Sequence, residues 1–234
     1  MTDRASLYQR LASAVSKMPA EHPLAERVCA AARELLGADG ASVTIDNPAR
    51  HRVTLCATDK RAGELENLQD VLGEGPCRDA FRTRLPISTE VDRWAASRWP
   101  AFIPAAERVV GPDGVLWSLP MHADSDVIGT LSLYRLSGAC LAEPIDTAQV
   151  LADAAAAMLC HDPEAQAPRT GTAGHAGHAA RAVVHQAVGV LMVQLCLGPD
   201  DAMTVLRAHT FAAGTQLGQV AQDVIDGTLN LSDG

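Results

Sequence analysis

Apolar residues at helical spacing open the chain. From Leu7 to Val15, and again from Leu24 to Leu35, apolar side chains recur every three or four positions, which places them on one face of a helix. Gly37 is a typical stop after the second of these patterns. We therefore predict two amphipathic helices at the start of the chain.

Four stretches that alternate between apolar and polar residues predict the strands of an antiparallel sheet. The predicted strands are residues 41–45, 52–56, 115–121 and 127–134. The last two form a hairpin around a tight polar link at residues 123–126. Further helices are predicted at residues 60–72 and 144–160. This order indicates an α+β domain whose helices are segregated to one side of the sheet.

A change of composition divides the chain. Pro163, Pro168 and three glycines leave residues 162–180 without a periodic apolar face, which predicts a linker. We therefore expect a first domain at residues 1–161 and an all-helical domain at residues 181–234.

The tail predicts three short helices. Gly198 ends the first, Pro199 begins the second, Gly214 closes it and Thr215 caps the third. The first helix carries an apolar seam, as expected of a packed or self-associating helix. The seam consists of Val184, Val188, Leu191 and Leu195. Because so small a unit has little core of its own, we predict a homodimer that pairs through this seam.

Composition and charge narrow the function. Hydrophobic residues make up 47% of the 234 residues and charged residues 20%, as in ordinary globular proteins. The formal net charge of -9 excludes a general attraction to phosphate backbones or to anionic membranes. Residues 181–234 hold two arginines and five aspartates, a formal charge of -3. Any contact with nucleic acid must therefore be local.

Several classes of protein are not expected. The six cysteines form no CxxC pair, which predicts reduced thiols, and the first residues lack a secretory pattern, which predicts a cytoplasmic protein. Residues 182–199 are uncharged, but His185 and Gln186 interrupt them, so no membrane span is expected. His175 and His178 lie in the linker without a cysteine partner, so no metal site is predicted. No catalytic motif is recognised, and neither an enzyme nor a cofactor is predicted.

Two groups of motifs resemble known domains. Residues 73–80, Gly-Glu-Gly-Pro-Cys-Arg-Asp-Ala, together with residues 98–100 and the hairpin, are similar to the GAF domains that precede ANTAR domains. In the tail, residues 186–192, 206–207 and 217–221 resemble the ANTAR domain. The resemblance implies a GAF sensor for a small molecule or a protein partner. It also implies an ANTAR domain that binds a nascent RNA hairpin and prevents a terminator from forming.

The resemblance places the RNA contacts on the tail helices. Arg207 can offer its planar guanidinium to a phosphate or a loop base, and Gln186 can read a base edge. The alternatives are a surface arginine paired with aspartates and a polar residue of the dimer seam. Gly189 can equally be a position of close helix packing. The predicted RNA-binding residues are Arg181, His185, Gln186, Gly189, Arg207, His209, Thr210 and Gln216.

A ligand pocket is expected in the first domain. The predicted lining residues, whose aromatic members can form the core instead, are Cys77, Trp94, Phe102, Trp117 and Leu119. An accessible, reactive thiol is expected at Cys77 if Arg78 lowers its pKa. The alternative is a small buried side chain.

The primary expectation is a cytoplasmic, homodimeric regulator that binds RNA hairpins and controls transcription termination and antitermination. Its effector, a small molecule or a protein, is not identified by any residue. Two other functions stay open. The acidic tail is compatible with a dimeric protein-interaction module whose ANTAR-like part no longer binds RNA. Some GAF folds reduce oxidised methionine through cysteines, and in such an enzyme Cys77 would be the nucleophile.

Overall fold

The computed structural model describes residues 4–47, 51–138, 140–160, 172–215 and 217–229. The chain divides into two compact units, residues 1–168 and residues 169–234. The first is mixed α and β, and the described secondary structure of the second consists of helices.

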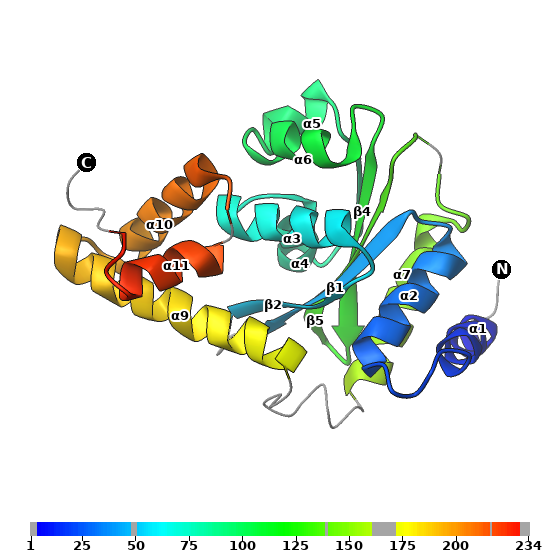
Figure 1. Cartoon of the computed structure of the whole chain (residues 1–234). Coiled ribbons are helices and arrows are strands. Elements are labelled where there is room, and N and C mark those ends of the chain that lie inside the picture. The colour runs from blue at the N-terminus through cyan, green and yellow to red at the C-terminus, as the bar shows by residue number, and fades with distance from the viewer. Residues whose placement is uncertain (1–3, 48–50, 139, 161–171, 216, 230–234) are drawn as a thin grey trace. The chain divides into compact units, whose positions relative to one another are not determined.

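The first unit contains a five-stranded sheet and its helices. Its elements in chain order (Figure 1) are α1 (Arg4–Ser16), α2 (Leu24–Leu36), β1 (Gly40–Asn47), β2 (His51–Ala57), α3 (Lys60–Leu72), α4 (Pro76–Thr83), β3 (Ile87–Glu90), α5 (Arg93–Arg98), α6 (Phe102–Val110), β4 (Val115–Ala123), β5 (Asp126–Arg135) and α7 (Ile145–Cys160). The four predicted strands and the predicted helices are therefore confirmed.

The sheet has the strand order β2-β1-β5-β4-β3, and every neighbouring pair is antiparallel. The sequence pattern does not predict β3, because its four residues are too few and too polar to show an alternation. The predicted hairpin is formed by β4 and β5. It turns at Asp124, whose φ of 54° is a left-handed conformation that aspartate tolerates better than most residues.

Helices cover both faces of the sheet, which corrects the expectation that they lie on one side. Trp117 and Leu119 of β4 join the core with α2 and α7, whereas Leu116 joins the core with α3 and α6. Figure 1 shows α2 and α7 on one side of the sheet and α3 and α4 on the other. The pattern misleads because β4 is apolar on both faces, so its alternation does not reveal a solvent side.

The end of α2 follows its predicted signal. Gly37 adopts a φ of 64°, and its N–H donates to the carbonyl of Glu34 at 3.2 Å. The N–H of Ala38 donates to the carbonyl of Arg33 at 3.0 Å. These bonds satisfy carbonyls that the helix end would otherwise leave without partners.

The second unit contains three helices, as predicted. They are α9 (Thr172–Leu195), α10 (Pro199–Ala213) and α11 (Leu217–Ile225). The first begins at Thr172 and not near residue 181, so the prediction of a non-helical linker is wrong over residues 172–180. Alanine is the strongest helix former and offsets the two glycines there, while the lack of an apolar stripe hides the helix from a periodicity argument.

The predicted dimer seam lies in the core of the second unit. Val188 and Leu191 of α9 are buried among residues of α10 and α11, and Val184 and Leu195 are partly buried against the same core. This corrects the prediction that the seam meets a second copy, because the chain's own helices already cover it. A stripe at this spacing looks the same in the sequence whether its partner is internal or external.

Candidate functional site

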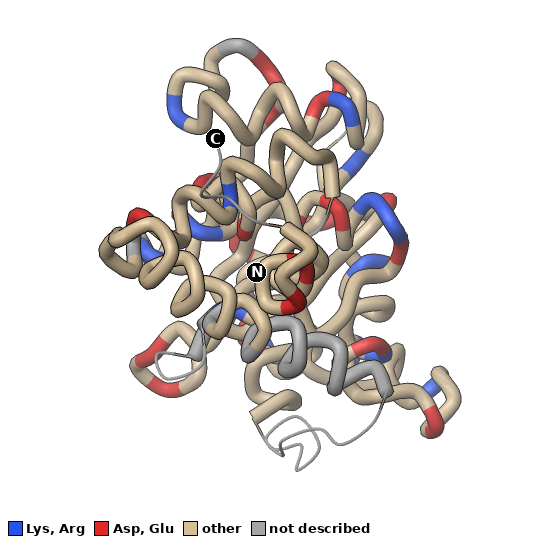
Figure 2. The backbone as a smooth tube through the Cα atoms, turned by 60° about the vertical axis from the view of Figure 1, so that its left-hand side comes forward, with Lys and Arg blue, Asp and Glu red and all other residues tan. Residues whose placement is uncertain are grey.

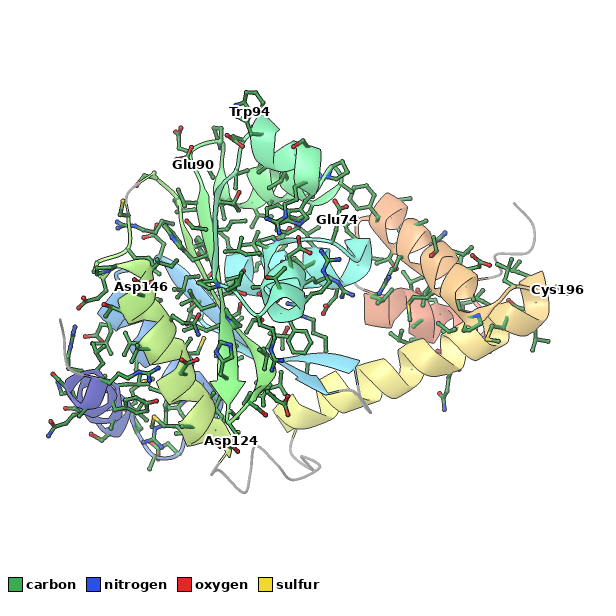
Figure 3. All side chains as sticks on the ribbon, turned by 180° about the vertical axis from the view of Figure 1, so that it is seen from behind. Glu74, Glu90, Trp94, Asp124, Asp146 and Cys196 are labelled. Carbon is green, nitrogen blue, oxygen red and sulfur yellow. The ribbon has the colours of Figure 1, made fainter. Side chains whose placement is uncertain are left out.

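The loop at residues 73–75 connects α3 to α4 and contacts the start of α6. Gly73 ends α3 with a φ of 71°, and its N–H donates to the carbonyl of Gln69 at 3.1 Å. One carboxylate oxygen of Glu74 accepts hydrogen bonds from the N–H groups of Ala101 and Phe102, at 2.7 and 2.8 Å. Figure 3 shows Glu74 at this junction. The carboxylate therefore satisfies donors at the start of α6, where negative charge is stabilising.

Gly75 lets this loop approach α3 closely. Its φ is 135°, and a Cβ at this position would lie 2.5 Å from Oε1 of Gln69. That same oxygen accepts a hydrogen bond from the N–H of Cys77 at 2.7 Å. Only glycine combines this backbone conformation with this approach.

A buried ionic cluster lies between α3 and the sheet. Glu66, only 1% exposed, accepts hydrogen bonds from the hydroxyls of Ser42 at 2.9 Å and Thr44 at 3.2 Å. The guanidinium of Arg52 pairs with Glu66 and, at 2.9 Å, with Asp70. Charges removed from water need such partners, so Glu66 and Arg52 depend on one another.

Cys77 belongs to the same cluster and is fully buried. Its sulfur contacts the guanidinium of Arg52 and lies 2.6 Å from the hydroxyl of Thr130. Burial raises the pKa of the Cys77 thiol to about 12, although the nearby Arg52 acts in the opposite direction. This corrects the expectation that Arg78 activates the thiol. A buried, protonated thiol is a poor nucleophile, so the geometry does not favour the enzyme alternative.

A cavity of about 20 Å3 adjoins this cluster. Its polar lining residues are Ser42, Glu66, Gln69, Ser118, Ser132 and Tyr134. Such a volume holds about one water molecule. The cavity as it stands is therefore too small for an organic ligand.

The structure separates the residues predicted to line one pocket. Phe102 and Trp117 line the small cavity, but Trp117 and Leu119 also belong to the core on the opposite face of the sheet. Cys77 lies in the ionic cluster that adjoins the small cavity, where its sulfur contacts Arg52. Trp94 is 72% exposed, and Figure 3 shows it at the outer end of α5. The prediction of a common pocket fails because strand alternation and the outward face of α5 send these side chains in different directions.

A second, open cleft of about 650 Å3 lies at one end of the sheet. Its cationic lining residues are Lys60, Arg61 and Arg108, and its acidic lining residues are Asp39, Asp59 and Glu64. Tyr134, Val109 and Leu136 complete the lining. The sequence does not indicate this cleft, because its residues come from four separate segments that only the fold brings together.

The buried polar residues of α3 are not among the site residues predicted above, although their spacing in the sequence carries a signal. Ala62, Leu65, Glu66 and Gln69 share one helix face at spacings of three and four residues, and all four are buried. Two polar residues on an otherwise apolar helix face indicate a buried polar site.

In the second unit, the predicted RNA-binding residues differ in exposure. Gln186 and Gly189 are exposed, and Arg207 and His209 are partly exposed. Thr210 is fully buried and its hydroxyl donates to the carbonyl of Leu206 at 2.7 Å, which corrects its assignment as an RNA contact. The side chains of Arg181 and His185, and the whole of Gln216, lie outside the described residues.

The outer face of α9 carries no charged residue among its described side chains. Val193 is 81% exposed, and a Cβ on Gly189 would have no heavy atom of another described residue outside its own helix backbone within 4 Å. Among the described residues, Gly189 is therefore not at a close helix contact. The turns of α9 from residue 183 onward carry neither blue nor red in Figure 2. On α10, Phe211 is 45% exposed and can meet a partner.

Two other classes of site are not found among the residues that the structure describes. No group of three or more metal-ligating side chains is found there. Within the same residues, none of the helices has the length and apolar character needed to traverse a lipid bilayer.

Comparisons with known proteins match both units. The family model of the GAF domain matches residues 20–160, and that of the ANTAR domain matches residues 175–225. No curated protein matches the chain. Similar solved structures include the GAF-B domain of DevS from Mycobacterium smegmatis, at 24% identity over 66% of this chain and 91% of that chain, with a TM-score of 0.38. A domain of a putative two-component sensor histidine kinase from Sinorhizobium meliloti 1021 is 22% identical over 66% of this chain and 100% of that chain, with a TM-score of 0.45.

Proposed function

Because the chain belongs to the GAF domain family and an ANTAR domain follows the GAF domain, we propose that the protein is a signal-responsive regulator that binds RNA hairpins and controls transcription termination. The order of the two domains carries this proposal, since it joins a sensor to an RNA-binding output. In the proposed mechanism, an effector bound by the GAF domain changes how the ANTAR helices meet a nascent hairpin. The regulator acts in the cytoplasm as a homodimer.

The proposed RNA contacts lie on α9 and α10. Gln186 and Gly189 are exposed and three residues apart, so they share one face of α9. A hairpin loop can be held there by hydrogen bonds to splayed bases, which needs no strongly basic surface. Residues 181–234 contain only two arginines, so the salt dependence of binding has a log–log slope no steeper than about -2.

The test is binding of the full chain to a pool of structured RNA hairpins at pH 8 and at two salt concentrations. Selective binding is expected, and Gln186→Ala is expected to weaken it about fivefold, the effect of losing one hydrogen bond. The matched control is Gln219→Ala, which makes the same change at an exposed position of α11. Circular dichroism checks that both variants remain helical. Absence of selective binding at both salt concentrations would contradict the proposal.

A second candidate function is the dimeric protein-interaction module. It is favoured by the outer face of α9, where Gln186, Gly189 and Val193 form an exposed stripe with no charged residue to repel an identical copy. In this candidate the stripe pairs with the stripe of a second chain. Analytical ultracentrifugation of the wild type and of Val193→Asp tests it. A dimer that dissociates in the variant, together with no RNA binding, would favour this candidate over the regulator.

A further inference from the structure

The open cleft beside Tyr134 has features of a ligand site. We propose that it binds a phosphate monoester that carries an apolar part, and that this ligand is the effector of the regulator. The ligand site stands on the geometry alone, whereas its role as effector rests on the proposed function.

Size separates this cleft from the cavity next to Glu66. The cleft measures about 650 Å3, within the range of about 300–1,000 Å3 that small-molecule sites occupy. The cavity measures about 20 Å3 and holds about one water molecule. Of these two spaces, only the cleft admits an organic molecule without movement of the protein.

Three cations line the cleft from two helices. Lys60 and Arg61 lie at the start of α3, Arg108 lies near the end of α6, and all three are exposed. Among the described residues, no carboxylate oxygen lies within 4.0 Å of their charged nitrogens. Arg61 also lies within hydrogen-bonding reach of the Tyr134 side chain. Because none of the three cations is held in such an ion pair within the described part of the chain and all three are exposed, an anion that enters the cleft can reach them.

Two of the three carboxylates in the cleft already accept hydrogen bonds from other groups of the protein. Asp59 accepts hydrogen bonds from the hydroxyl of Tyr134 at 2.9 Å and from the N–H of Ala62 at 3.0 Å. Asp39 accepts one from the N–H of Leu136 at 2.8 Å. Because three carboxylates balance three cations, the lining has no net charge, and an anion would be held by direct contacts with the cations rather than by a long-range field.

The donor set favours a phosphate monoester. Two guanidinium groups offer planar pairs of donors that match phosphate oxygens, and an ammonium group adds a third positive charge. A dianion gains more Coulomb attraction from the three cations than a singly charged group of the same shape does. Tyr134, Val109 and Leu136 provide an apolar surface for the remainder of the ligand.

Titration of the full-length protein with phenyl phosphate, followed by amide NMR spectra, tests the proposal. Phenyl phosphate is expected to bind at least tenfold more tightly than phenyl sulfate, which has the same shape and one charge fewer. The double variant Lys60→Gln, Arg108→Gln is expected to weaken phenyl phosphate at least tenfold, as expected for loss of charge-assisted hydrogen bonds. Lys17→Gln, an exposed charge change on another segment, is the matched control and is expected to change nothing.

The outcomes separate this proposal from the proposed function. Equal affinity for phenyl phosphate in the double variant, or equal affinity for inorganic phosphate and phenyl phosphate, would overturn the site. Hairpin binding measured without ligand tests the RNA output independently. Selective hairpin binding with no phenyl phosphate binding would overturn only the site. Phenyl phosphate binding that leaves hairpin affinity unchanged would support the site and overturn its role as effector.

Discussion

Replacing Arg52 by methionine tests whether the buried ionic cluster holds the GAF domain together. The side chain of Arg52 is 8% exposed and that of Glu66 is 2% exposed, so neither charge is well solvated in the folded state. Removal of the guanidinium leaves the carboxylate of Glu66 buried without a counter-charge. Breaking a buried pair in this way costs about 3–5 kcal/mol. The hydroxyls of Ser42 and Thr44 still donate to Glu66, so we expect a loss near the lower end, about 3 kcal/mol.

Urea denaturation followed by tryptophan fluorescence measures this loss. The three tryptophans, Trp94, Trp99 and Trp117, all lie in the first unit, so the signal reports its unfolding and not that of the ANTAR domain. For a unit of this size, about 3 kcal/mol corresponds to a fall of about 6–12 °C in Tm. The Tm measured by the same signal provides a second check.

Two further variants make the result interpretable. Arg82→Met removes an arginine that is 75% exposed and paired with Asp79, and is expected to cost no more than about 1 kcal/mol. Adding Glu66→Gln to Arg52→Met removes the unpaired charge, and should recover more than half of the lost stability. A loss below about 1 kcal/mol in Arg52→Met, or no recovery in the double variant, would refute the reasoning.

Two other predictions concern titration and surface exposure. Burial raises the pKa of Cys77 from 9.0 to about 12, and burial together with Asp59 raises the pKa of Tyr134 from 10.0 to about 12. Because the folded state holds these protons more tightly, stability should fall as the pH rises from about 9 towards 12, and urea midpoints that do not fall over this range would contradict the assignment. Trp99 is 3% exposed and Trp94 is 72% exposed, so Trp99→Ala should cost about 3–5 kcal/mol and Trp94→Ala less than about 1 kcal/mol, as measured by thermal unfolding followed by circular dichroism. Equal losses in the two variants would contradict the positions of these side chains.

The position of Cys77 shows that a local motif can predict the backbone conformation of a segment without predicting the burial of its side chains. Glycine and proline around a cysteine predict an irregular loop over residues 73–77, but only residues 73–75 form one between α3 and α4, and Pro76 and Cys77 begin α4. The motif does not reveal that the loop folds inward onto Gln69, which buries the thiol beside Arg52. Arg52 lies 25 residues earlier in the chain, so its effect on the thiol depends on the pairing of β2 with the rest of the sheet.

The distribution of charged residues along the sequence does not reveal the cleft. Figure 2 shows Lys and Arg positions interspersed with Asp and Glu positions along the first unit. In the sequence, Lys60 and Arg61 look like an ordinary solvated helix start. Only the approach of Arg108 from α6 and of Tyr134 from β5 makes these residues the lining of one cleft.

The sequence alone determined the element types and the order of the two domains. Periodic apolar spacing, turn residues and motif order are local properties, and they predicted four of the five strands of the sheet, most of the described helices and the family correctly. The tertiary structure decided which apolar faces are used within the chain and which polar residues share a site. The seam residues Val188 and Leu191 are buried against α10 and α11. The cluster at Glu66 joins strands and a helix that are distant in sequence. These outcomes depend on long-range packing, because burial and ion pairing follow from which elements meet and not from the spacing of residues within one element.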